Sequence, residues 1–151
     1  MRLRRLQLLS LRSPSVAVEG LDEVNAMFDR VIANTRRLVL PAIDQGADEF
    51  LAAARASCPV SQLETHTGAL KEGLMKSQNP FKEGQTLVGN YAYDDKGNYI
   101  AAHVELGHRA PDGSHVPAQP SFWPAWRLTR KRIYARIQRQ VTRAVREASV
   151  E

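Results

Sequence analysis

The chain has 151 residues, of which 43% are hydrophobic and 25% charged, and its formal net charge is +5. This length allows one ordinary domain with appendages and is too short for two sizeable cores. No apolar run approaches the roughly 20 residues that a membrane-spanning helix needs, so we expect a folded soluble protein with no membrane partner.

The positive charge is concentrated near the C-terminus. From Ser121 onward only Glu147 and Glu151 oppose eight basic residues: Arg127, Arg130, Lys131, Arg132, Arg136, Arg139, Arg143 and Arg146. That segment therefore carries +6 and the rest of the chain −1. A basic excess confined to one segment indicates a local polyanion or an acidic partner there.

Residues 1–15 form an N-terminal arm, "MRLRRLQLLSLRSPS". Arg12 interrupts an apolar run already too short for a signal peptide, and no small-residue cleavage site follows. The leucines of the arm cannot form a core of their own, and its arginines suit an acidic groove. We expect the arm to become ordered only against a neighbouring subunit or partner.

Two helices are expected next. The first has its apolar residues at helical spacing, with Asp22 and Glu23 near its start: Leu21, Val24, Phe28, Val31 and Ile32. The second continues the pattern with Leu40, Ile43, Ala47, Phe50, Leu51 and Ala54, and it closes before Pro59. Because Pro41 cannot donate to the helix ladder, we predict a break or kink near residues 35–41.

A small antiparallel sheet should follow a short helical turn at "TGALKEGL". Two runs rich in Val, Tyr, Leu and Ile flank the turn signal "DDKGN", where Asp94 and Asp95 are turn formers, and this pattern is typical of a β-hairpin. The second run, "YIAAHVEL", fits a strand or a short helix equally well, because eight residues are too few for periodicity to decide. "GHRAPDGSHVPAQP" is predicted to be loop.

Residues 121–151 predict one long amphipathic helix packed on a core of residues 16–120, with Pro124 tolerated in its first turn. Its apolar stripe comprises Trp126, Ile133, Ile137, Val141, Ala144 and Ala148. The arginines on its other faces are either a solvated surface or a nonspecific phosphate-binding surface. The predicted fold class is α+β: two N-terminal helices and this long helix on a small antiparallel sheet.

The stretch "HVELGH" raises the question of a metal site, because His103, Glu105 and His108 lie within six positions and His115 follows. As a strand or as a helix, the segment does not bring all three groups together. The sequence also contains no Gly-rich phosphate loop and no Gly-x-Ser-x-Gly elbow. We therefore expect no metal, no cofactor and no enzymatic activity. A metal-dependent hydrolase built on these three residues is the enzymatic alternative.

Three pieces of the sequence, in order, resemble the tail-completion or head–tail joining proteins of long-tailed siphophages, also described as minor tail components. The first is "GLDE" at Gly20–Glu23, and the second is Pro59-Val60 followed by "TGAL" at Thr67–Leu70. The third is "YIAAHVELG" followed by "PAQPSFWPAW" and the terminal helix. The resemblance covers nearly the whole chain after the first fifteen residues.

This resemblance implies a structural virion protein of the phage neck, located at the head–tail interface and in the host cytoplasm during assembly. The chain would form a ring around the DNA channel, with a hexamer favoured and a dodecamer as the alternative. Its partners would be head-closure or connector proteins on one side and a tail terminator or tail tube protein on the other. Channel DNA would be contacted nonspecifically. A small basic nonspecific nucleic-acid-binding protein is the alternative function.

Two groups of site residues follow from the resemblance and from the charge. An assembly or corner motif comprises Thr67, Gly68, Glu105, Gly107, Pro117, Gln119, Pro120, Trp123 and Trp126. A basic face towards DNA or a partner comprises Arg127, Arg130, Lys131, Arg136, Arg139, Arg143 and Arg146. In the corner, Glu105 is expected to accept hydrogen bonds from loop amides or a neighbouring subunit's arginine, and Gly107 to adopt torsions that a side chain forbids.

Overall fold

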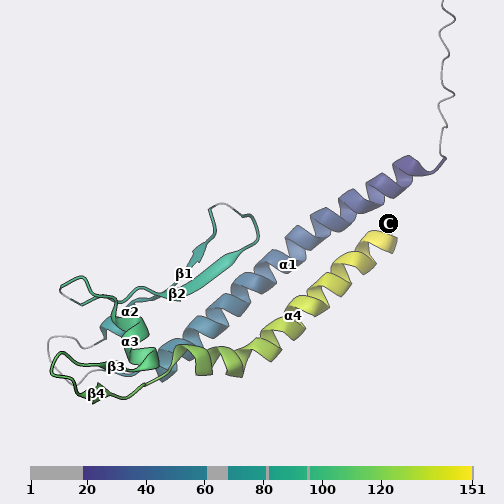
Figure 1. Ribbon diagram of the computed structural model, residues 1–151. Helices are drawn as coiled ribbons and strands as arrows, with labels where there is room; N and C mark the ends of the chain where they lie inside the picture. Colours follow the sequence, from purple (N-terminus) through teal and green to yellow (C-terminus); the bar gives the residue numbers. More distant parts are fainter. Residues whose placement is uncertain (1–18, 61–67, 81, 95, 151) are drawn as a thin grey trace, which may run out of the picture.

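Two long helices lying side by side dominate the structure (Figure 1). The computed structural model describes residues 19–60, 68–80, 82–94 and 96–150, so the expected N-terminal arm of residues 1–15 and the expected turn former Asp95 lie outside the described residues. Helix α1 spans Leu21–Ser57 and helix α4 spans Phe122–Val150. The remaining elements lie around the end where α1 finishes and α4 begins, and at the opposite end the start of α1 extends beyond the end of α4 (Figure 1).

Helix α1 corrects the prediction of two N-terminal helices. It is continuous over 37 residues with Pro41 inside it, so the expected break at 35–41 is wrong. Pro41 removes one backbone donor and disfavours the residue before it. However, its own side chain is exposed, whereas Val39 and Ala42 on either side are buried. Burial on both sides of the proline offsets the lost hydrogen bond and holds the helix together.

Helices α1 and α4 pack closely through small side chains. A Cβ atom on Gly46 of α1 would lie 2.7 Å from Cγ2 of Ile133 on α4, so only glycine fits at this contact. Ala54, Ala144 and Ala148 are fully buried. The core around this contact contains one more alanine, Ala125, and larger side chains: Phe50, Leu51, Cys58, Leu74 and Ile133.

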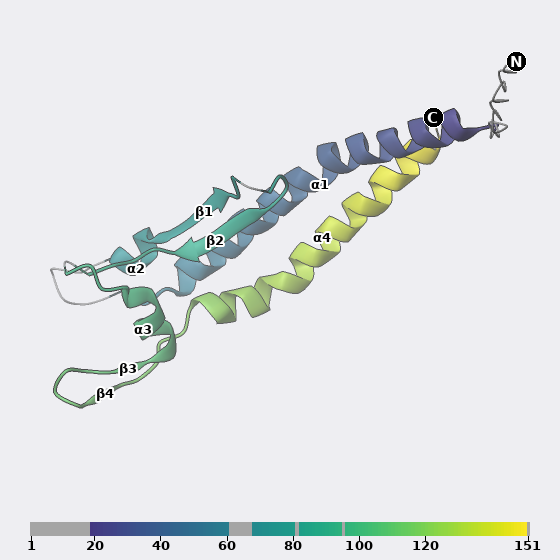
Figure 2. The ribbon, with the colours of Figure 1, turned by 45° about the horizontal axis from the view of Figure 1, so that its top comes forward.

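A two-stranded antiparallel sheet lies against α1 (Figure 2). Its strands are β1 (Leu74–Gln78) and β2 (Thr86–Asn90), with Leu74 opposite Asn90 and Gln78 opposite Thr86. The sequence-based hairpin was therefore placed at the wrong turn. Around "DDKGN" there is only one isolated bridge, between Tyr93 and Tyr99. Asp94 nevertheless acts as the predicted turn former, since its carboxylate accepts the backbone N–H groups of Lys96 and Asn98 at 2.9 and 2.7 Å.

The shorter elements connect the sheet to α4. Helix α2 (Ala69–Glu72) is the predicted helical turn. Helix α3 (Ile100–Leu106) decides the structure of the segment that the sequence allowed as a strand or a short helix: it is a helix. Strands β3 (His108–Arg109) and β4 (His115–Val116) pair within the stretch expected to be loop. Helix α4 is confirmed as the long terminal helix, with Pro124 in its first turn. The α+β fold class is therefore correct.

The outer half of the helix pair, away from the sheet, is less buried than the sequence suggested. Leu21, Val24, Phe28 and Ile32 were expected to form the packed face of a helix, but they are exposed, as is Val141 of the predicted stripe on α4. Within the described ranges, no helix is both long and apolar enough to cross a membrane. Several apolar side chains therefore lie on the surface of two amphipathic helices.

The close packing of α1 on α4 predicts that a larger residue at Ala144 destabilises the fold. Ala144→Leu forces extra methyl groups into a fully buried contact, and we expect a loss of about 1–3 kcal/mol in the free energy of unfolding. Urea unfolding measures it. Ala135→Leu is the matched control, because Ala135 lies on the same helix and is exposed. Equal unfolding midpoints for the two variants would contradict the packing described above.

Candidate functional site: the joint between α3 and α4

Glu105, near the end of α3, binds the start of α4. One carboxylate oxygen accepts the backbone N–H groups of Ser121 and Phe122 at 2.8 and 3.0 Å, and the other accepts that of Trp123 at 3.0 Å. The first N–H groups of a helix have no partner within the helix, and they lie at the positive end of its dipole. The carboxylate therefore satisfies three donors and places a negative charge where the helix favours it. The expectation that Glu105 accepts from loop amides is confirmed.

The backbone beside Glu105 makes a tight turn at Gly107. Its φ of 75° is in the left-handed region, and a Cβ atom there would lie 2.9 Å from both the nitrogen of Ala118 and the carbonyl oxygen of Val116. Gln119 donates its backbone N–H to the carbonyl oxygen of Val104 at 2.8 Å. Because Gly107 has no side chain, the segment leading into α4 can lie directly on the end of α3.

Residues at the end of α1 and in helix α2 lie beside this joint. Ser121 is 7% exposed, and its carbonyl oxygen accepts the hydroxyl hydrogen of Ser57 at 3.3 Å. Burial raises the pKa of the neighbouring Cys58 thiol, with the Ser121 contact acting in the opposite direction. Leu70 of α2 lies with Val104 in the walls of two shallow hollows, one of which also contains Glu105 and Ser121. Helices α1, α3 and α4 thus meet at Ser121.

The histidines near the joint do not gather around Glu105. The rings of His103 and His108 stack on each other with centroids 5.1 Å apart, whereas both oxygens of Glu105 bind the backbone of α4. His115 lies on β4, paired with Arg109. Within the part of the chain that the structure describes, no three His, Cys, Asp or Glu side chains come close enough to hold a metal ion.

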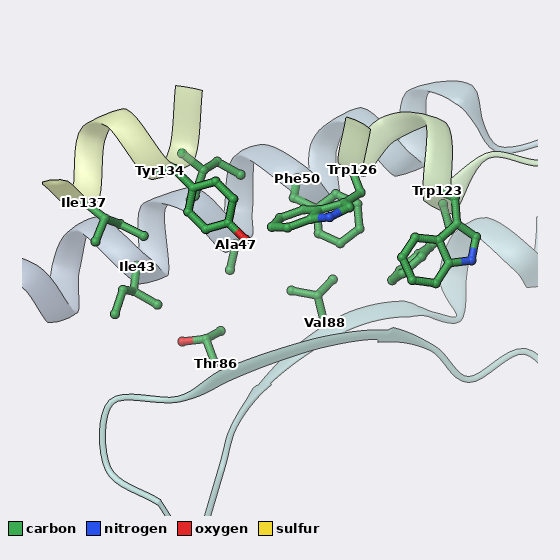
Figure 3. A pocket seen from close by; sticks show the side chains of 12 residues that line it. Ile43, Ala47, Phe50, Thr86, Val88, Trp123, Trp126, Tyr134 and Ile137 are labelled. Atoms are coloured by element: carbon green, nitrogen blue, oxygen red, sulfur yellow. The ribbon is translucent and has the colours of Figure 1, made fainter. Parts of the chain in front are cut away.

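An apolar groove runs from the joint along the helix pair, on the side that faces the sheet (Figure 3). Its cavity has a volume of about 340 Å³. The wall contains Ile43, Gly46, Ala47 and Phe50 of α1, Thr86 and Val88 of β2, and Phe122, Trp123, Trp126, Ile133, Tyr134 and Ile137 of α4. Trp126 packs edge-on against Phe50 with ring centroids 5.5 Å apart, and Trp123 stays 53% exposed at the end nearest the joint. We call this cavity the aromatic groove.

Two groups of basic residues on α4 have different surroundings. Arg132 and Arg136 bind Glu49 of α1, the latter at 2.7 Å, and Arg143 binds Glu147, which also binds Arg37. The Arg136 contact, followed by that of Arg132, holds the pKa of Glu49 below its usual value. Arg136, assigned from the sequence to the DNA- or partner-facing surface, therefore lies between the two helices.

Five other basic residues of α4 are exposed and have no acidic partner among the described residues: Arg127, Arg130, Lys131, Arg139 and Arg146. Arg139, Arg143 and Arg146 border a shallow hollow on the face of α4 turned away from α1. We call these five residues the basic face. Its charge is uncompensated, so it remains available to an anionic partner.

The structure brings only part of the predicted corner motif together. Glu105, Gly107, Gln119 and Trp123 meet at the joint, while Trp126 lies further along the groove. Pro117 and Pro120 are exposed on the segment entering α4. Gly68 directly precedes α2 and has a φ of 99°, and Thr67 lies outside the described residues.

Sequence reasoning missed Glu49 and Ser121. Glu49 lies on α1 beside the basic helix, and the sequence signal was an acidic residue with Gly46, Ala52 and Ala53 as neighbours at helical spacing. Ser121 comes directly before the first residue of α4, where a small polar residue is preferred.

Comparisons of the chain with protein-family models, with curated proteins and with solved structures find no match. The geometry of the joint and the resemblance of its motifs therefore carry the functional inference.

Removing the Glu105 carboxylate should destabilise the protein. In Glu105→Ala three backbone donors at the start of α4 lose their acceptor, and we expect the free energy of unfolding to fall by about 2 kcal/mol. Glu105→Gln keeps one acceptor oxygen and should lose less. Urea unfolding measures both, and hydrogen exchange at Phe122 and Trp123 should accelerate in the alanine variant. Unchanged exchange at these amides would show that Glu105 does not cap α4.

The lowered pKa of Glu49 gives a pH dependence. Because the folded pKa lies below the ordinary value of 4.5, the ion pairs contribute fully above that pH, and their contribution is lost as the pH falls through the folded pKa. The stability difference between wild type and Glu49→Gln should be constant from about pH 7 to 5 and shrink below about 4.5. Glu23→Gln, with an exposed carboxylate, should show no such trend. A difference independent of pH would rule out these pairs as a source of stability.

Proposed function

We propose that this chain is a structural protein of the neck of a long-tailed phage, where it forms a ring that joins the DNA-filled head to the tail tube. A hexamer is favoured and a dodecamer is the alternative. The partners proposed are the head-closure or connector proteins and a tail terminator or tail tube protein. The chain would reach this position in the virion from the host cytoplasm, and it would act without catalysis or a cofactor.

The observation that carries this proposal is the joint. The two motif pieces "YIAAHVELG" and "PAQPSFWPAW" resemble the joining proteins and are separated in the sequence by a loop, yet their residues bind one another. Glu105 from the first piece accepts the N–H groups of Ser121, Phe122 and Trp123 in the second. Gly107 provides the close approach that the contact needs. The motif residues thus have a shared physical role, which is to fix the direction in which α4 leaves.

Fixing that direction suits a ring component. Helix α4 has 29 residues and is therefore about 43 Å long, so a small change of angle at its start moves its end by several ångströms. Copies in a ring must present identical surfaces to their neighbours. A partly buried, charge-assisted contact at the start of the helix keeps the angle constant from copy to copy.

The basic face supports a position beside DNA or an acidic neighbour. Arg127, Arg130, Lys131, Arg139 and Arg146 are exposed and lie along one helix. Arginine and lysine attract phosphate groups without reading base sequence. A channel through which a duplex passes requires attraction of this nonspecific kind.

The same five side chains favour a second candidate, a small nonspecific nucleic-acid-binding protein acting alone. The two functions differ in the behaviour of the free chain. A nucleic-acid-binding protein binds duplex DNA as a monomer, with an affinity that falls steeply with salt, by about 0.9 logarithmic units per contacted phosphate for each tenfold rise. A neck component needs its ring and its protein partners to act.

The basic face predicts an assembly defect that can be counted in particles. The triple reversal of Lys131, Arg139 and Arg146 to glutamate should leave filled heads and separate tails that fail to join, because DNA or an acidic neighbour is no longer attracted. Electron microscopy of lysates from a phage whose own copy is replaced by this variant measures joined particles. The fold should persist, since changes at exposed positions alter stability by about 0.5 kcal/mol each. Arg136 and Arg143 are left intact because they bind Glu49 and Glu147.

A control with the same change of charge separates the basic face from net charge alone. Lys71, Lys82 and Lys96 are exposed and lie outside α4, and their reversal to glutamate should leave joining unaffected. Infectious, fully joined particles that carry the α4 triple reversal would show that the basic face is only a solvated surface. Joined particles in a phage lacking the chain altogether would refute the neck assignment itself.

A further inference from the structure

Strand β2 pairs with β1 along one edge, and its other edge has no partner strand among the described residues. Just outside the ladder, Asn79 donates its backbone N–H to the carbonyl oxygen of Gln85 at 2.8 Å. Hydrogen-bonded and non-hydrogen-bonded pairs alternate along an antiparallel ladder, so the N–H and C=O groups of Thr86 and Val88 point away from β1. We call this side of β2 the free edge.

The two edges of the sheet differ in how they are protected. On the outer edge of β1, Arg55 donates to the carbonyl oxygen of Leu74 at 2.7 Å, and Lys76 binds Asp44 of α1 at 2.9 Å. Charged side chains of this kind discourage pairing with another chain. Strand β2 has the sequence TLVGN, which contains no charged residue and no proline. The free edge of β2 is therefore the edge suited to pairing with a further strand.

The aromatic groove lies beside the free edge. Thr86 and Val88 line it from the sheet, whereas Trp126, Tyr134 and Ile137 line it from α4 (Figure 3). No residue of β1 is among its lining residues, so β2 is the strand nearer to α4 at the groove. Neighbouring strands lie about 4.8 Å apart. A third strand on β2 would therefore lie over the groove, and every second side chain of it would point into the groove.

Two basic residues of α4 add charge beside the groove. Arg127 follows Trp123 by four residues, and Arg130 precedes Tyr134 by four. Residues four apart are neighbours on one helix face, and both aromatic residues line the groove. The two arginines are exposed and have no acidic partner among the described residues. Carboxylates on a bound segment would complement this charge.

We propose that the free edge of β2 and the aromatic groove together bind an extended, acidic segment of a partner protein, which joins the sheet as a third strand. Its backbone pairs with Thr86 and Val88, its apolar side chains at alternate positions fill the groove, and its carboxylates bind Arg127 and Arg130. In this mode of recognition the main chain supplies affinity and the alternate side chains supply specificity. The inference does not depend on the neck function.

The free edge favours a peptide over single-stranded nucleic acid, which also binds to aromatic and basic side chains. Thr86 and Val88 each offer a donor and an acceptor, and a second peptide backbone matches both. A sugar–phosphate backbone has no N–H group to give to their carbonyl oxygens. Trp126 is also already packed against Phe50, with ring centroids 5.5 Å apart, and is only partly exposed.

A peptide titration on the full chain tests the proposal. Both tryptophans of the chain line the groove, so intrinsic fluorescence reports on its occupancy. The probe is a synthetic peptide of alternating valine and threonine with aspartates at both ends. We expect a saturable change of fluorescence below about 1 mM peptide and slower hydrogen exchange at the amides of Thr86 and Val88. The same peptide with lysines at its ends should bind at least about tenfold more weakly.

A matched pair of proline variants tests the edge itself. Thr86→Pro removes an outward N–H at the first residue of β2, a position where an edge strand tolerates proline, and it should weaken binding about tenfold. Gln78→Pro is the control, because Gln78 lies opposite Thr86 and its N–H points to the other edge of the sheet. It should leave binding unchanged. Circular dichroism checks that both variants fold, and Arg127→Glu with Arg130→Glu tests the charge without altering the backbone.

Four outcomes would overturn the proposal. The first is no saturable change with the aspartate peptide, and the second is equal affinity in the two proline variants and in the double arginine variant. The third is displacement of the peptide by an equal concentration of oligothymidylate, which would assign the groove to nucleic acid. The last is protection of the Thr86 amide that rises with protein concentration without peptide, which would assign the edge to a second copy. None of these outcomes depends on whether the chain joins phage heads to tails.

Discussion

The carboxylate of Glu105 at the start of α4 is the contact on which the rest of the structure depends. It joins the last part of α3 to the first residues of α4, and these two segments are separated by the β3–β4 hairpin and a proline-containing loop. The direction of α4 relative to α1 follows from this contact, since Ser121 is held at the same time by Ser57 at the end of α1. If α4 began at another angle, Ile133 could not reach Gly46, and Ala144 and Ala148 could not lie against α1.

Close packing of the helices decides which basic residues of α4 form ion pairs within the chain. Because α1 and α4 meet through small residues, side chains at the edges of the contact are near enough to bind across it. Glu49 therefore takes Arg132 and Arg136, and Glu147 links Arg37 to Arg143. These pairs are partly exposed and stabilise the fold modestly. The other arginines and the lysine of α4 have no acidic partner among the described residues and keep their charge, so a helix that is basic throughout its sequence has a neutralised edge beside α1 and exposed positive charge elsewhere.

The parts of the fold that depend on local signals could be predicted from the sequence. Helix α4 has a continuous apolar stripe with a proline in its first turn, Asp94 lies in a turn with glycine, and Glu105 precedes a glycine that permits a tight corner. The failures involve distant contacts. Pro41 stays inside α1 because Val39 and Ala42 are buried. The local sequence around a proline does not indicate such burial, because it comes from residues elsewhere in the chain. Strand β2 pairs with β1, a segment with little apolar alternation, and the partner of Arg136 lies 87 residues away.

The two ends of the helix pair differ in how far their side chains and backbone groups find partners within the chain. At the joint, backbone donors, aromatic rings and the end of α1 all find partners within the chain, so this end can hold a fixed geometry. At the outer end the helices are still paired, as the complete burial of Ala148 shows, yet Phe28 and Ile32 of α1 remain exposed. Two helices can bury only the faces that they turn to each other. At the joint the sheet and α3 lie over a further side of the helix pair, whereas the exposed apolar side chains at the start of α1 have no such cover among the described residues.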